Sequence, residues 1–161
     1  MLSSMLAALL VIPASVSVSS GPRVGPPLNA PRADGEALIV NSGSTNREGY
    51  RLRVYASGWI EVQQGAIPVR VPGRRRAPAA LVARFFDDLN AAGRLDTLPA
   101  VHCMKSVSFG STTWIGYHGA VSPDMSCPSP SAAARALAVD ANALAGAAGV
   151  TSMQSRPLKP L

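Results

Sequence analysis

The sequence predicts an α+β domain, with an antiparallel sheet of four to six strands and two helices packed on one face of it. Two observations lead to this prediction. Short runs in which apolar residues recur every second position occur together with two longer runs that have helical spacing. These elements follow the order β-β-α-β-β-α, which is typical of antiparallel sheets with segregated helices. The 161 residues suffice for one ordinary domain, so we expect no second one.

The first half of the chain predicts four extended runs, two of them paired in a hairpin. Glu36 to Asn41, EALIVN, is too short for a helix and apolar at its centre. From Gly49 to Gln63, alternating apolar side chains on both sides of Ala56-Ser57-Gly58 predict a β-hairpin. Ala66 to Val71 also alternates, but Pro68 cannot donate a hydrogen bond to a ladder. We therefore expect an edge strand or an extended arm there.

Two segments predict helices. Pro78 to Gly93 has large apolar side chains on one helical face, with proline and glycine at the ends where helices favour them. The five apolar residues are Leu81, Val82, Phe85, Phe86 and Leu89. A second, alanine-rich helix follows Cys127, with Ser129 as its N-cap and Gly146 or Gly149 at its end.

The segment from His102 to Cys127 contains both cysteines and both histidines. Lys105 to Phe109 and Thr112 to Tyr117 are β-prone runs on either side of Gly110-Ser111, which predicts a second hairpin. The cysteines bracket this hairpin.

The amino terminus resembles a secretory signal. Residues 1–20 carry no charged side chain, and an apolar run ends at Pro13 before small residues. An uncleaved anchor or a merely buried segment are the alternatives. We expect residues 21–35 to be a flexible linker, 36–150 the domain and 151–161 a loose tail, in a periplasmic or secreted protein without a membrane span after cleavage.

Two cysteines in an exported protein most simply form one disulfide, here between Cys103 and Cys127. The alternatives are a redox thiol or a zinc site completed by His102 and His118. We expect the disulfide, and we expect neither a metal nor a cofactor.

The formal net charge of +6 favours an anionic partner, such as an envelope component, or another protein. Arg74, Arg75 and Arg76 form the dense basic cluster, which the flanking glycine and prolines predict to be a solvated loop. No nucleic-acid partner is expected, because no basic stripe with interleaved aromatic residues is present. A GC-rich genome also encodes many arginines by default, and we favour this explanation of the charge over an anionic partner.

The aromatic residues of the strands have two interpretations. Trp59, Trp114 and Tyr117 belong either to the core or to a binding surface on an open sheet face. Together with Arg74 to Arg76 they are the candidate binding residues.

We expect no catalytic residue. The enzymatic alternative is a serine-type hydrolase in which Lys105 activates the hydroxyl of Ser42 or Ser44. Neither an SxxK helix nor a GxSxG elbow supports it, and the hydroxyls of SGST also suit a turn.

The chain resembles a family of small secreted bacterial proteins without assigned function. The resemblance rests on SGSTN followed by GYRLRV, on RFFDDLNAAGRLDTLP, and on HCMKSVSFG followed by a late cysteine. It implies an exported α+β protein over about Glu36 to Val150, and it implies no catalytic residue. We therefore expect an exported, non-enzymatic binding or interaction module of the cell envelope.

Overall fold

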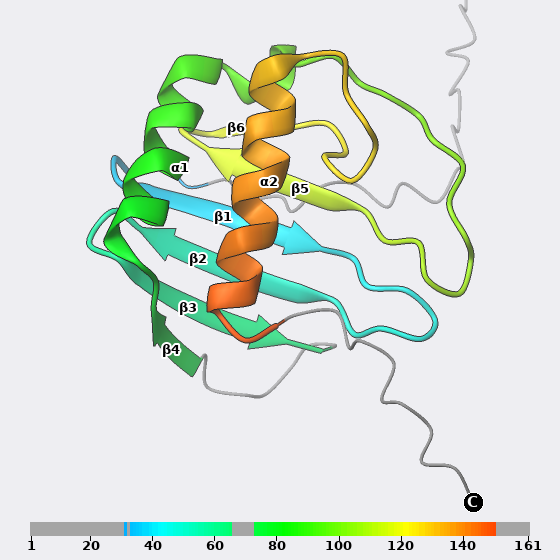
Figure 1. The fold of residues 1–161 in the computed structure, drawn as a ribbon, viewed down its shortest axis with the longest axis horizontal. Coiled ribbons are helices and arrows are strands. Elements are labelled where there is room, and N and C mark those ends of the chain that lie inside the picture. The colour runs from blue at the N-terminus through cyan, green and yellow to red at the C-terminus, as the bar shows by residue number, and fades with distance from the viewer. Residues whose placement is uncertain (1–30, 32, 66–72, 151–161) are drawn as a thin grey trace, which may run out of the picture.

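The computed structural model describes residues 31, 33–65 and 73–150. Within these residues it has a single antiparallel sheet with two helices on one face, so the α+β prediction is confirmed (Figure 1). The strands are β1 (Glu36–Asn41), β2 (Tyr50–Tyr55), β3 (Trp59–Gln64), β4 (Gly73–Arg76), β5 (Thr113–Tyr117) and β6 (Ala120–Val121). The helices are α1 (Ala79–Ala92), the 3-10 turn η1 (Leu95–Thr97) and α2 (Ala132–Ala147). The strand order across the sheet is β4-β3-β2-β1-β5-β6.

The core lies between the helices and the inner face of the sheet. Ile39 of β1 pairs with Leu52 of β2 on one side and with Ile115 of β5 on the other, and all three are fully buried. The helices cover them with large apolar side chains, of which Phe85, Leu89, Leu137 and Leu144 are fully buried. Because side chains alternate between faces, the residues beside these core positions lie on the outer face.

The first hairpin and the first helix follow the sequence closely. Tyr50–Tyr55 and Trp59–Gln64 pair around the expected turn. Helix α1 begins after Pro78 and ends before Gly93, whose φ of 67° is costly for residues with a Cβ. Both ends were readable because proline and glycine have opposite positional preferences in helices.

Arg74, Arg75 and Arg76 were predicted to lie in a solvated loop, and this prediction is wrong. They belong to the edge strand β4. Arg76 pairs with Trp59 and Arg74 pairs with Glu61 across the ladder. An edge strand needs only one neighbour and can be exposed on both faces, so it shows no apolar alternation. The residue composition of Gly73–Arg76 therefore gave no indication that its backbone is a regular strand.

The predicted strand from Lys105 to Phe109 is also wrong. Of that hairpin only the second strand forms, as β5, and it turns at His118 into β6. β1 occupies one edge of β5, while β6 and the segment after it occupy the other, where Ser122 and Met125 bond to β5. Both edges of β5 are thus taken, and the 105–109 segment has no strand to join.

Helix α2 begins two residues later than predicted. Its N-cap is Ser131, whose Oγ accepts a hydrogen bond from the backbone N of Ala134 at 3.3 Å. Ser129 instead accepts from the N of Ser131, one step outside the helix. The predicted signal, most of the linker, the Ala66 to Val71 run and the 151–161 tail lie outside the described residues. No helix within the described residues is long and apolar enough to cross a membrane.

Candidate functional site

The disulfide is present. Cys103 and Cys127 are bonded at an S–S distance of 2.02 Å, with their Cα atoms 5.6 Å apart. Cys127 is buried and Cys103 is exposed. The bond ties the irregular segment before β5 to the one that leads into α2. Both thiols are thereby removed from redox or metal chemistry, and no cluster of three metal-ligating side chains exists among the described residues.

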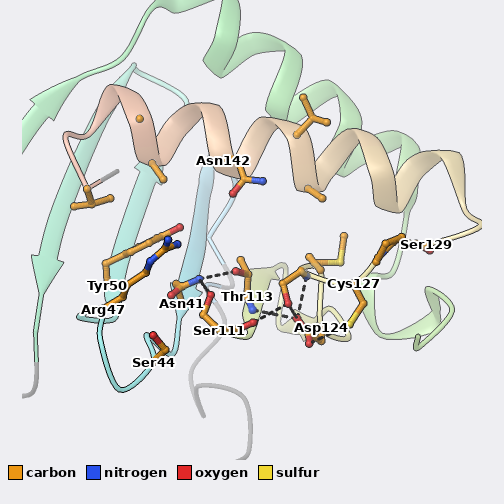
Figure 2. A pocket seen from close by; sticks show the side chains of 18 of the residues that line it. Asn41, Ser44, Arg47, Tyr50, Ser111, Thr113, Asp124, Cys127, Ser129 and Asn142 are labelled. Atoms are coloured by element: carbon orange, nitrogen blue, oxygen red, sulfur yellow. Dashed lines mark hydrogen bonds between the residues drawn. The ribbon is translucent and has the colours of Figure 1, made fainter. Parts of the chain in front are cut away.

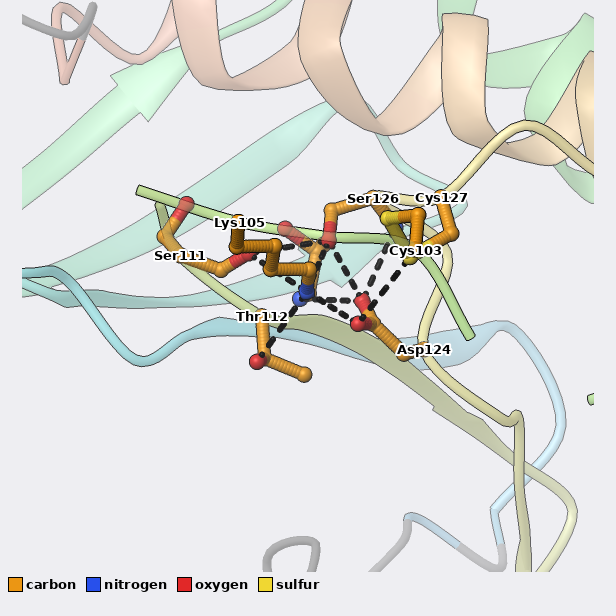
Figure 3. The surroundings of a disulfide bond; sticks show 8 residues. Cys103, Lys105, Ser111, Thr112, Asp124, Ser126 and Cys127 are labelled. Carbon is orange, nitrogen blue, oxygen red and sulfur yellow. Dashed lines mark hydrogen bonds and ion pairs between the residues drawn. A yellow bond between two sulfur atoms is a disulfide. The ribbon is translucent and has the colours of Figure 1, made fainter. Parts of the chain in front are cut away.

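Lys105 lies beside the disulfide and joins the same two segments (Figure 3). Its Nζ donates to the carbonyl O of Ser111 at 2.9 Å, to the Oγ of Ser126 at 2.7 Å and to Thr112 Oγ1 at 3.3 Å. It also forms an ion pair with Asp124. The amine is therefore fully engaged, and the lysine side chain points inward, with 24% of it exposed.

Asp124 is the anionic centre of this cluster. Its Oδ1 accepts from the backbone N of Thr113 at 3.2 Å and of Ser126 at 2.9 Å, and from Ser126 Oγ at 2.6 Å. Partial burial acts to raise the pKa of Asp124, but the hydrogen bonds from Lys105 and Ser126 outweigh it and hold the pKa below its usual value. At neutral pH Lys105 and Asp124 thus form a charged pair, which we call the Lys105–Asp124 pair, that links the two segments.

The two serines of the hydrolase alternative form turn contacts. Ser42 Oγ donates to the O of Gly43 and accepts from the N of Thr112, each at 2.9 Å. Ser44 Oγ donates to the O of Ser108 at 2.9 Å. Within the described part of the chain neither hydroxyl is hydrogen-bonded to Lys105, whose serine partner is Ser126. Sequence reasoning missed Ser126 and Asp124, which follow Lys105 by 21 and 19 residues in an irregular segment.

The segment around Lys105, from Met104 to Phe109, carries apolar side chains that are exposed to solvent. Met104 is fully exposed at 101%, Val107 at 87% and Phe109 at 57%. Among the described residues, the large exposed hydrophobic side chains otherwise include only Val139 of α2. Because Lys105 to Phe109 was predicted to be a strand of the sheet, the sequence analysis did not identify these exposed side chains as a surface.

A groove of about 1040 Å³ lies between α2 and the end of the sheet near the SGSTN turn (Figure 2). On its floor, Asn41 Nδ2 donates to Ser111 Oγ at 3.0 Å and to Thr113 Oγ1 at 2.8 Å. Alanines of α2, such as Ala138, form much of the roof, and their small side chains leave the space open. The groove collects polar residues from segments far apart in sequence, so no local motif indicated it.

The candidate binding residues separate onto the two faces of the sheet. Trp59 and Trp114 are half-buried on the outer face, because their neighbours Ile60 and Ile115 are in the core. Tyr117 points inward, where its ring lies 5.9 Å from that of Phe86. Tyr117 is therefore a core residue and does not contribute to a surface on the outer face.

Trp59 and two arginines of β4 form one exposed cluster on the outer face, which we call the Arg-Trp edge. The Cζ atom of Arg74 lies 4.9 Å from the Trp59 ring centroid, and that of Arg76 lies 5.5 Å from it. Arg75 is on the opposite face and donates to the O of Arg74 at 3.1 Å. The sequence analysis named Trp59 and the three arginines as candidate binding residues. It did not show that Arg75 lies on the opposite face of the sheet from the other three.

The histidines lie apart from this edge. His118 occupies the β5–β6 turn with a φ of 47°, stacks on Tyr117 and approaches Asp34 at 3.0 Å. His102 is exposed beside the disulfide.

Comparison with known proteins identifies no relative. No family model, no curated protein and no solved structure matches this chain. The function must therefore be argued from the residues themselves.

Proposed function

We propose that this chain is an exported, non-enzymatic binding module that holds an anionic partner, such as an envelope polymer, at the Arg-Trp edge. The observation that carries the proposal is that the guanidinium groups of Arg74 and Arg76 both lie over the ring of Trp59. The ring thus contacts two guanidinium groups of one exposed strand.

A guanidinium that stacks through its flat face keeps its N–H groups free to donate in the plane. Neither Arg74 nor Arg76 forms an ion pair with any described residue. On the same face, Arg53 is instead occupied by Glu36 and by Glu61. The two arginines of the edge thus have donors left for phosphate, sulfate or carboxylate groups, which they can bind in bidentate geometry.

Two further observations support the proposal. A disulfide with one exposed cysteine is stable in an oxidising compartment, which supports export. The engagement of the Lys105 amine by Asp124 leaves no free base beside Ser42 or Ser44, which supports a non-enzymatic role. The hydrolase alternative stays a prediction, and labelling by a serine-reactive probe that Ser42→Ala or Ser44→Ala abolishes is its test.

The test of the Arg-Trp edge is retention on a sulfated-polysaccharide column across a salt gradient. We expect the double variant Arg74→Gln/Arg76→Gln to elute at clearly lower salt than the native chain. The matched control is Arg47→Gln/Arg135→Gln, which removes the same charge from other exposed positions. Equal shifts in the two double variants would show that net charge alone causes retention and would overturn the proposal.

Arginines on an edge strand also hinder pairing between copies of a protein. The oligomeric state of each variant is therefore measured by light scattering before the column experiment. Trp59→Leu provides the second arm, because it keeps both charges and removes the ring that contacts them. We expect an intermediate loss of retention.

A further inference from the structure

The segment from Val101 to Phe109, which we call the Met104 loop, is irregular and mostly exposed, and the trace that contains it after η1 runs long and open at the edge of the molecule (Figure 1). Residues 101–106 belong to no helix, strand or turn. Their backbone N–H and C=O groups before Ser106 form no hydrogen bond with any described residue. Free backbone of this kind can pair with an added strand from a partner.

The loop also presents apolar side chains where folded proteins normally place few. Met104, Val107 and Phe109 are 101%, 87% and 57% exposed and lie within six positions of one another. A cluster of exposed apolar side chains in one segment indicates a surface that another protein covers.

Although exposed, the loop is held in one shape from both ends. Cys103 is fixed by the disulfide, and Lys105 by its contacts behind the loop. Met104 lies between these two anchors, so its side chain projects outward from a restrained backbone. A partner that binds it does not have to order the loop first, which lowers the cost of binding.

The far end of the loop is anchored by the SGSTN turn. The N of Asn46 and the Oγ of Ser44 donate to the O of Ser108 at 3.2 and 2.9 Å, and Thr45 Oγ1 donates to the O of Val107 at 3.3 Å. The guanidinium of Arg47 lies 5.8 Å from the ring centroid of Phe109. These contacts give the SGSTN turn a structural role as the support of the loop.

We propose that the Met104 loop occupies the substrate cleft of an extracytoplasmic serine endopeptidase and inhibits it, with the Met104 side chain in the primary specificity pocket. Endopeptidases bind their substrates as extended strands through backbone hydrogen bonds, and the backbone of residues 101–105 has no such bonds with the described residues and is free to form them. This proposal does not rest on the Arg-Trp edge, which lies on β3 and β4.

The anchors explain why binding would inhibit the peptidase instead of consuming the chain. Attack of the peptidase's serine hydroxyl on the Met104 carbonyl carbon breaks the Met104–Lys105 bond, leaves Met104 as an ester on that serine, and passes the serine proton to the new amino group of Lys105. Neither new end can leave, because Cys103 holds one through the disulfide and Asp124 holds the other through the lysine side chain. The amino group therefore stays beside the carbonyl carbon and can displace the enzyme to restore the peptide bond.

The geometry also selects the class of peptidase. Lys105 is turned inward and bound to Asp124, so it is not available to a pocket that requires a basic side chain. Met104, an unbranched apolar side chain, is fully exposed beside it. The expected target is an enzyme with a deep apolar pocket.

The experiment measures inhibition of subtilisin, chymotrypsin and trypsin by the disulfide-bonded chain, using short chromogenic peptide substrates. We expect inhibition of at least one of the two enzymes with apolar pockets and none of trypsin. Met104→Asp should weaken that inhibition by about 100-fold, as for a central interface residue. Met104→Lys should transfer inhibition to trypsin.

The control is Val139→Asp, which places the same charge at another exposed apolar position on α2. Thermal unfolding confirms that each variant is folded before its inhibition is measured. The proposal is overturned if the native chain slows none of the three enzymes at micromolar concentration, if it inhibits trypsin through Lys105, or if Met104→Asp inhibits as well as the native chain. Rapid cleavage at Met104–Lys105 with the disulfide intact would also overturn it.

Discussion

Arg84 of α1 donates two hydrogen bonds to one carboxylate oxygen of Asp140 on α2, from Nε at 2.8 Å and from Nη2 at 2.5 Å. Asp140 is 1% exposed, and its second oxygen, Oδ2, has no hydrogen-bond partner among the described residues. This pair is a polar contact between α1 and α2, the two helices that cover the sheet in Figure 1. A buried carboxylate with one bonded oxygen depends on its partner for compensation.

Replacement of Arg84 alone should therefore reduce the stability of the fold more than replacement of both Arg84 and Asp140. We expect Arg84→Met to lower the Tm by about 5 °C, because it leaves the Asp140 carboxylate buried without a counterion. The double variant Arg84→Met/Asp140→Leu should recover most of this loss. Thermal unfolding followed by circular dichroism measures both, and a double variant less stable than Arg84→Met would contradict the expectation.

The neighbouring Asp88 makes the stability of this helix pair depend on pH. Partial burial and the nearby Asp140 carboxyl raise the pKa of Asp88 above the ordinary aspartate value of 3.8, against the lowering effect of Arg84. A raised carboxyl pKa means that the folded state binds the proton more tightly than the unfolded state. The ionised side chain thus destabilises the fold above its folded pKa, and protonation relieves this as pH falls toward 3.8.

We expect Asp88→Asn to stabilise the fold at pH 7 by about 0.5 kcal/mol. The advantage should shrink as the pH falls through the raised pKa of Asp88. Urea unfolding at pH 7 and pH 4 compares the variant with the native chain. Asp87→Asn is the matched control, since Asp87 is exposed on the same helix. A gain that does not depend on pH would refute the role of Asp88 ionisation.

Reduction of the disulfide should destabilise the fold and free the Met104 loop. Cys103 and Cys127 are 24 positions apart. Closing a loop of this length restricts the unfolded chain and stabilises the fold by about 3 kcal/mol. We expect Cys103→Ser/Cys127→Ser to lose about this amount in denaturant unfolding. It should also be cleaved faster near Met104 by a nonspecific protease, whereas equal cleavage rates would show that the bond does not restrain the loop.

The sequence predicted the elements whose patterns are local and missed those that depend on a distant neighbour. Helix α1 and the β2–β3 hairpin have both their apolar period and their end signals in adjacent residues. Strand β4 exists because β3 offers an edge, and Arg74 to Arg76 carry no sign of that edge. The run from Lys105 to Phe109 has the right composition for a strand, but other segments already occupy both edges of β5.

The candidate site shows the same division. The disulfide followed from the cysteine count and the signal-like amino terminus, and the structure bears it out. The sequence analysis named Lys105 but gave no sign of its partners Asp124 and Ser126, because they lie in a segment without periodicity. Met104 points outward between a cysteine fixed by the disulfide and a lysine that turns inward to Asp124, and only the tertiary contacts determine this arrangement.

The Lys105–Asp124 pair leads to the last prediction. Burial acts to raise the pKa of Asp124, but the hydrogen bonds from Lys105, Ser126 and Thr113 outweigh it and hold this pKa below the ordinary aspartate value of 3.8. Its contribution to stability is therefore present above pH 3.8 and is lost as the pH falls through the lowered folded pKa. We expect Asp124→Asn to cost about 2 kcal/mol at pH 7, since it replaces charge-assisted hydrogen bonds to a side chain that is 21% exposed. The cost should diminish in acid, where the native carboxyl is also neutral. Denaturant unfolding at pH 7 and at pH 2 measures it, and Asp96→Asn is the control, because its ion pair with Arg94 lies on the exposed surface. A loss of the same size at both pH values would mean that Asp124 acts through its shape and backbone contacts, and not through its charge.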